Sequence, residues 1–320
     1  MGWRMACVIL CLLGRQGFGQ QQETIQSRAR TARERGAFTE ALTLFREAVS
    51  RTPDNASLPD LLDELAELEY RTGRFSEAER SAARALVTRK RLFGPDHPSI
   101  ATGMNNLGEV LFAQGRHKEA EEYYRQALAR VQRETPPDLE RQAKMLVNLG
   151  KTLTARRDRE ASEVLRQALD LWTTLGNAFE QAATLGNLGL LMRQRGRYAE
   201  AEQMHMSALK RLDPDHPNAI AERINLADVL RIQKRYGESQ RQFDQALPLL
   251  ESRFGRDHPD RATALMLYAN LLRATHRTGE ANRTLAEAKR IQQTHARTDG
   301  SAWVVNATLQ ESTLTPRAAQ

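Results

Sequence analysis

The chain has 320 residues, of which 40% are apolar and 6% aromatic, and its 47 Lys and Arg against 40 Asp and Glu give a net charge of +7. Apolar residues are too sparse for a parallel sheet buried on both faces, whose strands need near-continuous runs of Val and Ile. Two cysteines exclude a disulfide scaffold, and 19 Gly and 11 Pro exclude a collagen-like chain. Because the cations are spread along the chain and mixed with Glu, the charge does not favour a nucleic-acid binder.

Residues 1–20 differ in character from the rest of the chain. Arg4 gives a positive start, Met5–Leu13 is apolar, and Gly17 and Gly19 offer small residues at a possible cleavage point. This pattern resembles a secretory signal peptide, so we expect a periplasmic or secreted protein, or a cytoplasmic one if the segment is no signal. Nine apolar residues are fewer than the about twenty that span a bilayer, so no transmembrane segment is expected in the mature chain.

From residue 36 onward the chain repeats one pattern: Gly, then an aromatic two positions later, then Ala, a large residue and a second Ala at helical spacing. The pattern occurs seven times, and successive copies are 37 to 42 residues apart. The final alanines of the copies are Ala48, Ala85, Ala127, Ala168, Ala208, Ala246 and Ala288. Each copy predicts one amphipathic helix, and a second periodic segment upstream of it predicts another.

The turn between the two predicted helices carries Gly in several copies, as in Gln114-Gly115-Arg116. Glycine adopts the left-handed conformation that ends a helix, so each copy predicts a tight antiparallel helix pair. The fourth copy has Arg156-Arg157-Asp158 at this place and is one residue short, so its corner is expected to be distorted. The corners of the sixth and seventh copies also lack glycine and have Lys234 and His276 instead.

The repeat resembles the tetratricopeptide repeat, and its period of about forty residues is similar to the kinesin-light-chain subtype. The motifs that carry the resemblance are Asn-Leu-Gly/Ala in the first helix, Gly-Arg-Tyr-x-Glu-Ala-Glu at 196–202, and Asp-His-Pro between repeats. The resemblance implies an all-α fold, an α-solenoid of about seven antiparallel helix pairs wound as a right-handed superhelix. The first helix of each pair would line the concave face. The solenoid is predicted to span residues 22–294, followed by a polar C-terminal tail at 295–320.

No catalytic constellation is visible in the sequence. Asp-His-Pro occurs at 96–98, 215–217 and 257–259, where the histidines could act as metal ligands or acid–base groups, but proline at a helix start favours a capping role. Leu149-Gly150-Lys151-Thr152 imitates the end of a phosphate-binding loop, but Met145 stands where that loop needs glycine. We therefore expect no enzyme activity, no metal and no cofactor.

Asparagine recurs at one position of four successive first helices, as Asn106, Asn148, Asn187 and Asn225. Asparagine is a poor residue inside a helix, so its recurrence needs a reason. Tetratricopeptide repeat proteins commonly place asparagines there, and the resemblance implies that they hydrogen-bond the backbone of an extended peptide. The alternative is that these amides bridge neighbouring helices.

Six residues further along, three consecutive repeats carry Arg193, Arg231 and Arg273. If they border the groove, it would prefer acidic segments or a carboxylate, which arginine binds with two parallel hydrogen bonds. Alternatively they are solvated. The sequence therefore predicts a non-enzymatic scaffold that binds an extended peptide or protein segment of unknown identity in its concave groove. An accessory or regulatory subunit of an enzyme complex is the alternative, and a nucleic-acid binder comes after both.

Overall fold

The computed structural model describes residues 25–298, which consist of α-helices joined by short turns, with no β-strand among them. The predicted signal peptide at 1–20 and the tail beyond residue 298 lie outside the described residues. None of the described helices is long and apolar enough to cross a membrane. The predicted all-α fold of helix pairs is confirmed.

The helices follow one another as pairs. A helical segment at residues 25–34 precedes α2 (Phe38–Arg51). The later pairs are α3 (Leu58–Arg71) with α4 (Phe75–Phe93), α5 (Ser99–Ala113) with α6 (His117–Val131), α7 (Leu139–Ala155) with α8 (Ala161–Thr174), α9 (Ala178–Gln194) with α10 (Tyr198–Leu209), α11 (Pro217–Ile232) with α12 (Tyr236–Phe254), and α13 (Pro259–Ala274) with α14 (Thr278–Thr298). Helix α14 continues beyond residue 294, where the sequence predicted the repeats to end.

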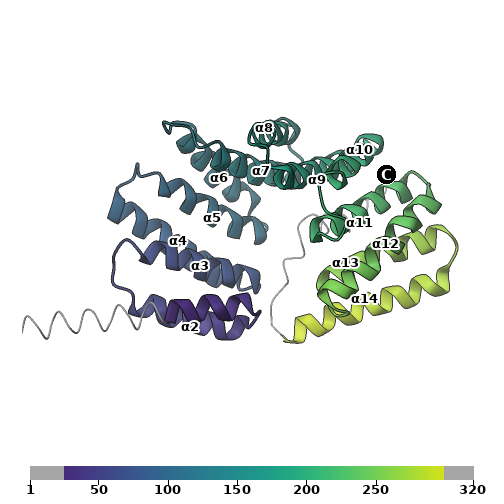
Figure 1. Ribbon diagram of the computed structural model, residues 1–320, viewed down its shortest axis with the longest axis horizontal. Coiled ribbons are helices and arrows are strands. Elements are labelled where there is room, and N and C mark those ends of the chain that lie inside the picture. The colour runs from purple at the N-terminus through teal and green to yellow at the C-terminus, as the bar shows by residue number, and fades with distance from the viewer. Residues whose placement is uncertain (1–24, 299–320) are drawn as a thin grey trace, which may run out of the picture. The chain divides into compact units, whose positions relative to one another are not determined.

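The chain divides into two compact units, Met1–Gly115 and Arg116–Gln320. In the first unit, drawn in purple and blue in Figure 1, α3 packs against both α2 and α4, and α5 packs against α4. The apolar stripes of residues 25–34, α2 and α3, with Ala85 of α4, form one core, in which Phe45 and Leu68 are fully buried. Each helix therefore buries the stripe that its sequence pattern predicts.

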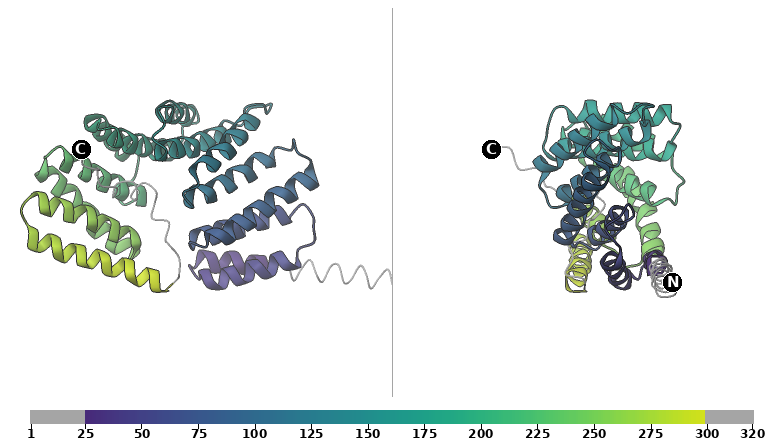
Figure 2. Two further views of the ribbon diagram at one scale, coloured as in Figure 1. Left: turned by 180° about the vertical axis from the view of Figure 1, so that it is seen from behind. Right: turned by 90° about the vertical axis from the view of Figure 1, so that its left-hand side faces the viewer.

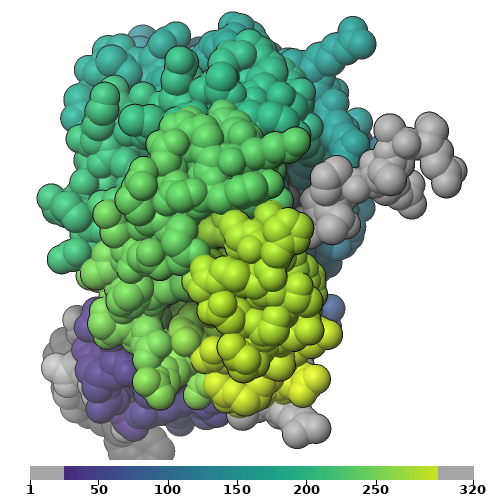
Figure 3. All heavy atoms as spheres, turned by 90° about the vertical axis from the view of Figure 1, so that its right-hand side faces the viewer, coloured from purple at the N-terminus to yellow at the C-terminus, as the bar shows by residue number. Residues whose placement is uncertain are grey.

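In the second unit the first helices pack in series, because α9 contacts α7 and α11, and α11 contacts α13. Each also packs on the second helix of its own pair and on that of the pair before it, as the paired ribbons of Figure 2 show. Figure 3 shows the packed surface of the green and yellow helices, α11 to α14. Trp172, Tyr124 and Phe243 are the largest fully buried side chains of this unit.

Small residues mark the places where helices approach closely. All seven repeating alanines have 0% of their surface exposed. Gly150 and Gly189 lie inside helices, and a Cβ atom there would come within 2.5 Å of Leu165 and 2.6 Å of His205. A side chain at either glycine would collide with the neighbouring helix, which explains why residues that weaken a helix recur in it.

The corner of the fourth repeat differs from the others only after its turn: α8 begins at Ala161, four residues after Arg157, whereas α10 begins two residues after Gly196. The turn itself keeps the usual conformation. Arg157 adopts φ of 58°, in the same left-handed region as Gly196 in the next repeat at 74°. The backbone N–H of Asp158 donates to Leu153 O at 2.8 Å, which matches the bond from Arg197 to Met192 O at 2.9 Å in that repeat. The hydrogen bonds of the corner thus hold a non-glycine residue in a conformation that costs about 1–2 kcal/mol.

Lys234 and His276 do the same in their repeats, with φ of 63° and 61°. In these corners too, the second residue of the turn donates its N–H to a carbonyl five residues earlier, to Leu230 from Arg235 and to Leu272 from Arg277. Helix packing on both sides therefore determines the corner geometry, and glycine only lowers its cost.

Candidate functional site

The predicted site residues all lie on first helices. Asn106 is on α5, in the first unit. In the second unit, Asn148 is on α7, Asn187 and Arg193 are on α9, Asn225 and Arg231 are on α11, and Arg273 is on α13. Because α7, α9, α11 and α13 pack in series, the six residues of the second unit stand on successive neighbouring helices.

The four asparagines have different surroundings. The Asn106 side chain hydrogen-bonds the Asp63 carboxyl of α3, which also receives Arg89. Burial raises the pKa of Asp63, while the hydrogen bonds from Arg89 and Asn106 oppose that rise. At this position the amide therefore bridges neighbouring helices, as the structural alternative predicted.

Asn225 is fully buried, and neither its Oδ1 nor its Nδ2 has a hydrogen-bond partner in the described part of the chain. A buried amide without a partner costs about 1–3 kcal/mol, so its retention is unusual. Asn187, by contrast, is half-buried, and its amide has no partner among residues 25–298. Asn148 is also half-buried. Of the four amides, Asn187 is therefore best placed to meet a ligand.

Arg193 and Arg231 hold one buried carboxylate between them. Asp228 of α11 has 0% of its surface exposed; its Oδ2 accepts from Arg193 Nε at 2.8 Å and Nη2 at 2.6 Å, and its Oδ1 accepts from Arg231 Nε at 2.9 Å and Nη2 at 2.8 Å. The two arginine side chains remain 13% and 23% exposed. Two cations around one anion leave a net charge of +1 at this place.

Neither role predicted for these arginines includes the bond to Asp228, which the sequence analysis missed. The available signal was an acidic residue three positions before Arg231, on the face of the helix that also carries Asn225. Arg273 differs from the other two: it is exposed and forms no ion pair with any residue of 25–298. It agrees with the solvated alternative and is also free to meet a ligand.

A second buried polar pair lies beside this clamp. His205 of α10 and Glu222 of α11 are 0% and 4% exposed, and His205 Nδ1 lies 2.6 Å from Glu222 Oε2. Both press on glycines of α9: a Cβ at Gly189 would meet the imidazole, and one at Gly186 would meet the carboxylate at 2.1 Å. The sequence analysis missed this pairing.

Glu222, Asn225 and Asp228 are spaced by three residues and so share one side of α11. Glu222 faces Gly186 and Asp228 faces Arg193, so this side of α11 lies along α9. We call Glu222, Asn225, Asp228 and His205 the polar core of α9–α11. Every charge in such a buried polar group needs a partner, because an unpaired buried charge is strongly destabilising.

The Asp-His-Pro motifs cap helices. Nδ1 of His216 accepts the N–H of Asn218 at 3.1 Å, and Nδ1 of His258 accepts that of Asp260 at 3.2 Å. His97 accepts the N–H of Ser99 in the same way, at 3.3 Å. The capping interpretation is confirmed. Within residues 25–298 no three His, Cys, Asp or Glu side chains gather where they could hold a metal ion. Residues 149–152 lie inside α7, where no phosphate-binding loop can form.

The sequence pattern of the tetratricopeptide repeat family matches residues 57–133, 141–213 and 218–294. These three segments cover more than half of the chain. The chain belongs to the tetratricopeptide repeat family. No curated protein matches its sequence.

Solved structures share the fold of this tetratricopeptide repeat protein. BtubC (BKLC) from P. vanneervenii is 19% identical, with 72% of this chain and 92% of that chain covered and a TM-score of 0.54. A kinesin light chain from Podospora anserina with nearly identical TPR-like repeats is 20% identical, with 63% and 99% covered and a TM-score of 0.51. The kinesin-light-chain-like type of repeat predicted from the sequence is confirmed.

A Rap protein solved in complex with Competence and Sporulation Factor is 16% identical, with 85% of this chain and 75% of that chain covered and a TM-score of 0.62. At this identity the likeness shows the fold alone. The binding chemistry of this tetratricopeptide repeat protein therefore rests on its own side chains. On the first helices of the second unit these are the free amide of Asn187, the +1 clamp around Asp228, and the exposed Arg273.

Proposed function

We propose that this protein is a non-enzymatic interaction scaffold that binds an extended segment of a partner protein on the first helices of its second unit. The observation that carries the proposal is the Asn187 amide, half-buried on α9 and without a partner among the described residues. An amide has both a donor and an acceptor, which suits a peptide main chain whatever its side chains are. The membership of the tetratricopeptide repeat family supports a binding role.

The arginines give this face its preference. The Arg193–Asp228–Arg231 clamp carries a net positive charge, and both arginine side chains remain partly exposed. Arg273 adds an uncommitted cation on the next first helix. An extended segment with a carboxylate near the clamp would therefore bind better than a neutral one. Asp228 fixes the two arginines in place, so they lose less conformational freedom on binding than solvated arginines would.

The experiment starts from a displayed library of random peptides, from which binders to the whole protein are selected and their affinities measured by calorimetry. Asn187→Ala should weaken binding roughly two- to tenfold, as expected for the loss of hydrogen bonds of about 0.5–1.5 kcal/mol each. Methylating the peptide nitrogen that Asn187 contacts should cause a similar loss in the native protein and a smaller one in Asn187→Ala.

The matched control is Asn282→Ala, an exposed asparagine on the second helix α14. It should leave the affinity unchanged, and far-UV circular dichroism should show the native helix content in both variants. Equal affinities of native protein and Asn187→Ala for every selected peptide would refute the proposed site. Asn225→Ala tests whether the buried amide of Asn225 also takes part in binding, because this amide can contact a ligand only if binding exposes it.

A further inference from the structure

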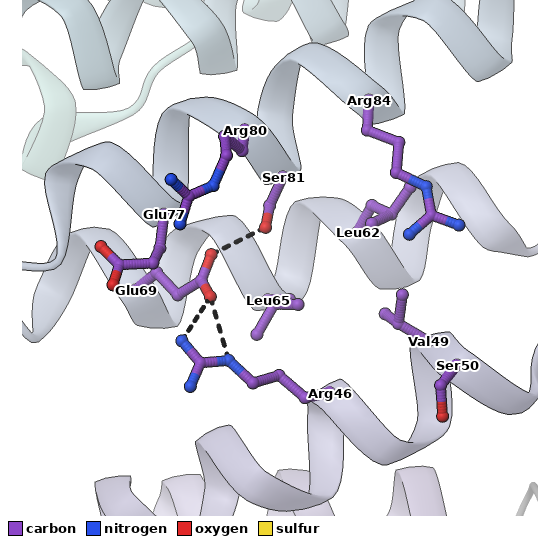
Figure 4. A pocket seen from close by; sticks show the side chains of 10 residues that line it. All are labelled: Arg46, Val49, Ser50, Leu62, Leu65, Glu69, Glu77, Arg80, Ser81 and Arg84. Atoms are coloured by element: carbon purple, nitrogen blue, oxygen red, sulfur yellow. Dashed lines mark hydrogen bonds and ion pairs between the residues drawn. The ribbon is translucent and has the colours of Figure 1, made fainter.

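A pocket of about 500 Å³ lies in the first unit, between the second helices α2 and α4 and over the first helix α3 (Figure 4). Pockets that hold ligands commonly measure 300–1,000 Å³. This pocket is on other helices than the site proposed above, and the proposed function does not use it. Its lining separates into an apolar side and a charged side, which together define what it can hold.

The apolar side consists of Val49 of α2 with Leu62 and Leu65 of α3. All three are buried, at 7%, 2% and 4% exposure, so they belong to the core and form a fixed surface. An apolar side chain that enters the pocket would exchange water for these three residues. Ser50 of α2 also lines the pocket and is exposed, so it marks an open edge.

One charge in the pocket is neutralised internally. Glu69 of α3 is 2% exposed, and its Oε1 accepts from Arg46 at 2.9 Å while its Oε2 accepts from Ser81 at 2.7 Å (Figure 4). Both carboxylate oxygens thus have partners, as a buried anion requires. Arg46 is committed to Glu69 and adds no free charge.

Two further arginines are uncommitted. Arg80 and Arg84 of α4 line the pocket, are exposed, and form no ion pair with any residue of 25–298. Their spacing of four residues puts them on the same side of α4, and Figure 4 shows Arg80 extending toward Glu77 at one end of the pocket and Arg84 toward the opposite end. Glu77 stands one turn before them, and the pocket as a whole carries three arginines and two glutamates, a net charge of +1.

We propose that this pocket is a second docking site, which takes an acidic segment of a partner protein. An apolar side chain of the segment sits on Val49, Leu62 and Leu65, and Asp or Glu carboxylates on either side of it bind Arg80 and Arg84. The two arginines lie along an exposed helix turn beside an open pocket, so a chain that continues past the pocket fits this geometry better than an enclosed small molecule. Charge complementarity selects an acidic segment over a basic one.

The probe is a fluorescein-labelled twelve-residue peptide of alternating leucine and glutamate, titrated into the full chain by fluorescence anisotropy. We expect saturable binding that weakens as salt rises from 50 to 300 mM, because exposed charges are screened. Arg80→Gln/Arg84→Gln should weaken it roughly tenfold, the loss expected for charge-assisted hydrogen bonds. The control Arg166→Gln/Arg241→Gln removes the same charge from exposed positions on α8 and α12 and should change the affinity less than twofold.

Ser50→Trp tests the pocket without altering its charges. The indole should fill the open edge and abolish binding of the leucine–glutamate peptide, with helix content checked by circular dichroism. Peptides in which serine replaces leucine, or glutamine replaces glutamate, should each bind at least tenfold more weakly. Asn187→Ala should leave binding unchanged, which separates this site from the proposed function.

Several results would overturn the inference. They are an absence of binding by the leucine–glutamate peptide, equal losses in the two double-arginine variants, and unchanged binding to Ser50→Trp. If the peptide in which serine replaces leucine bound as tightly as the leucine–glutamate peptide, this would show that the pocket is not used. Displacement of the peptide by decanoate at a concentration equal to that of the peptide would show that the pocket holds a small carboxylate amphiphile and not a protein segment.

Discussion

Gly189→Ala should destabilise the protein, although alanine is the better helix former. Gly189 lies inside α9, and a Cβ atom there would come within 2.6 Å of His205 Cε1, 2.7 Å of Nε2 and 2.9 Å of Nδ1. The imidazole cannot move aside, because it is fully buried and its Nδ1 is 2.6 Å from Glu222 Oε2. Relief of the clash therefore requires either that α9 and α10 separate or that the His205–Glu222 bond breaks.

The size of the effect follows from two opposing terms. Overpacking a buried contact costs about 1–3 kcal/mol, and replacing glycine by alanine inside a helix gains about 1 kcal/mol. The net loss should be about 0–2 kcal/mol, centred on about 1 kcal/mol. Gly237→Ala in α12 is the matched control, because no heavy atom lies within 4 Å of its added Cβ. That variant should be neutral or more stable by up to about 1 kcal/mol.

Urea denaturation followed by circular dichroism at 222 nm measures both variants, with the slope compared as well as the midpoint because repeat proteins can unfold in parts. In a His205→Ala background the clash disappears, so Gly189→Ala should then be neutral or stabilising. The reasoning is refuted if Gly189→Ala stabilises the native background as Gly237→Ala does, or if its cost persists when His205 is absent.

Two further predictions concern the corners and one tyrosine. Lys234→Gly and His276→Gly should each raise the free energy of unfolding by up to about 1 kcal/mol, since glycine adopts their positive φ without strain; unchanged urea midpoints would show that these corners carry no strain. Burial, with Glu109 nearby, raises the pKa of Tyr70 to about 12. In the unfolded state the tyrosine pKa is near 10, so between about pH 10 and 12 the hydroxyl is ionised in the unfolded state but still protonated in the folded state. The free energy of unfolding should therefore fall from about pH 10 toward 12. Tyr70→Phe should remove this component of alkaline unfolding, and an ultraviolet titration with all tyrosines ionising near pH 10 would contradict the shift.

The sequence was sufficient for the fold because the repeating residues are packing requirements. Each final alanine of the repeat is fully buried, so a period of about forty residues identifies a helix pair each time it recurs. The absence of glycine at Arg157 leaves the turn conformation unchanged, because the flanking helices impose it whichever residue occupies the position, and only the start of α8 is displaced.

The site could be predicted only in part, because periodicity assigns a residue to a helix but not to its partner. Asn187 and Asn225 occupy the same position of the repeat, yet one is half-buried and the other fully buried. Arg193 and Asp228 are 35 residues apart, and His205 and Glu222 are 17 apart. No repeat pattern encodes these pairs, since each occurs once and depends on which side chains the next helix presents.

The polar core of α9–α11 also bears on the order in which the repeats assemble. Most helix contacts in the chain use alanine and leucine, which fit nearly any other repeat, so helices of similar sequence can associate out of order during folding. Helix α11 is different, because Glu222 lies against His205 of α10 and Asp228 accepts from Arg193 of α9 as well as from Arg231 of its own helix. Association with any other pair would leave Glu222 without its imidazole partner and Asp228 without one of its two arginines, and breaking such buried pairs costs up to several kcal/mol. The fifth and sixth repeats thus pair specifically with each other, and this contact sets the order in which the other repeats pack on either side within the second unit.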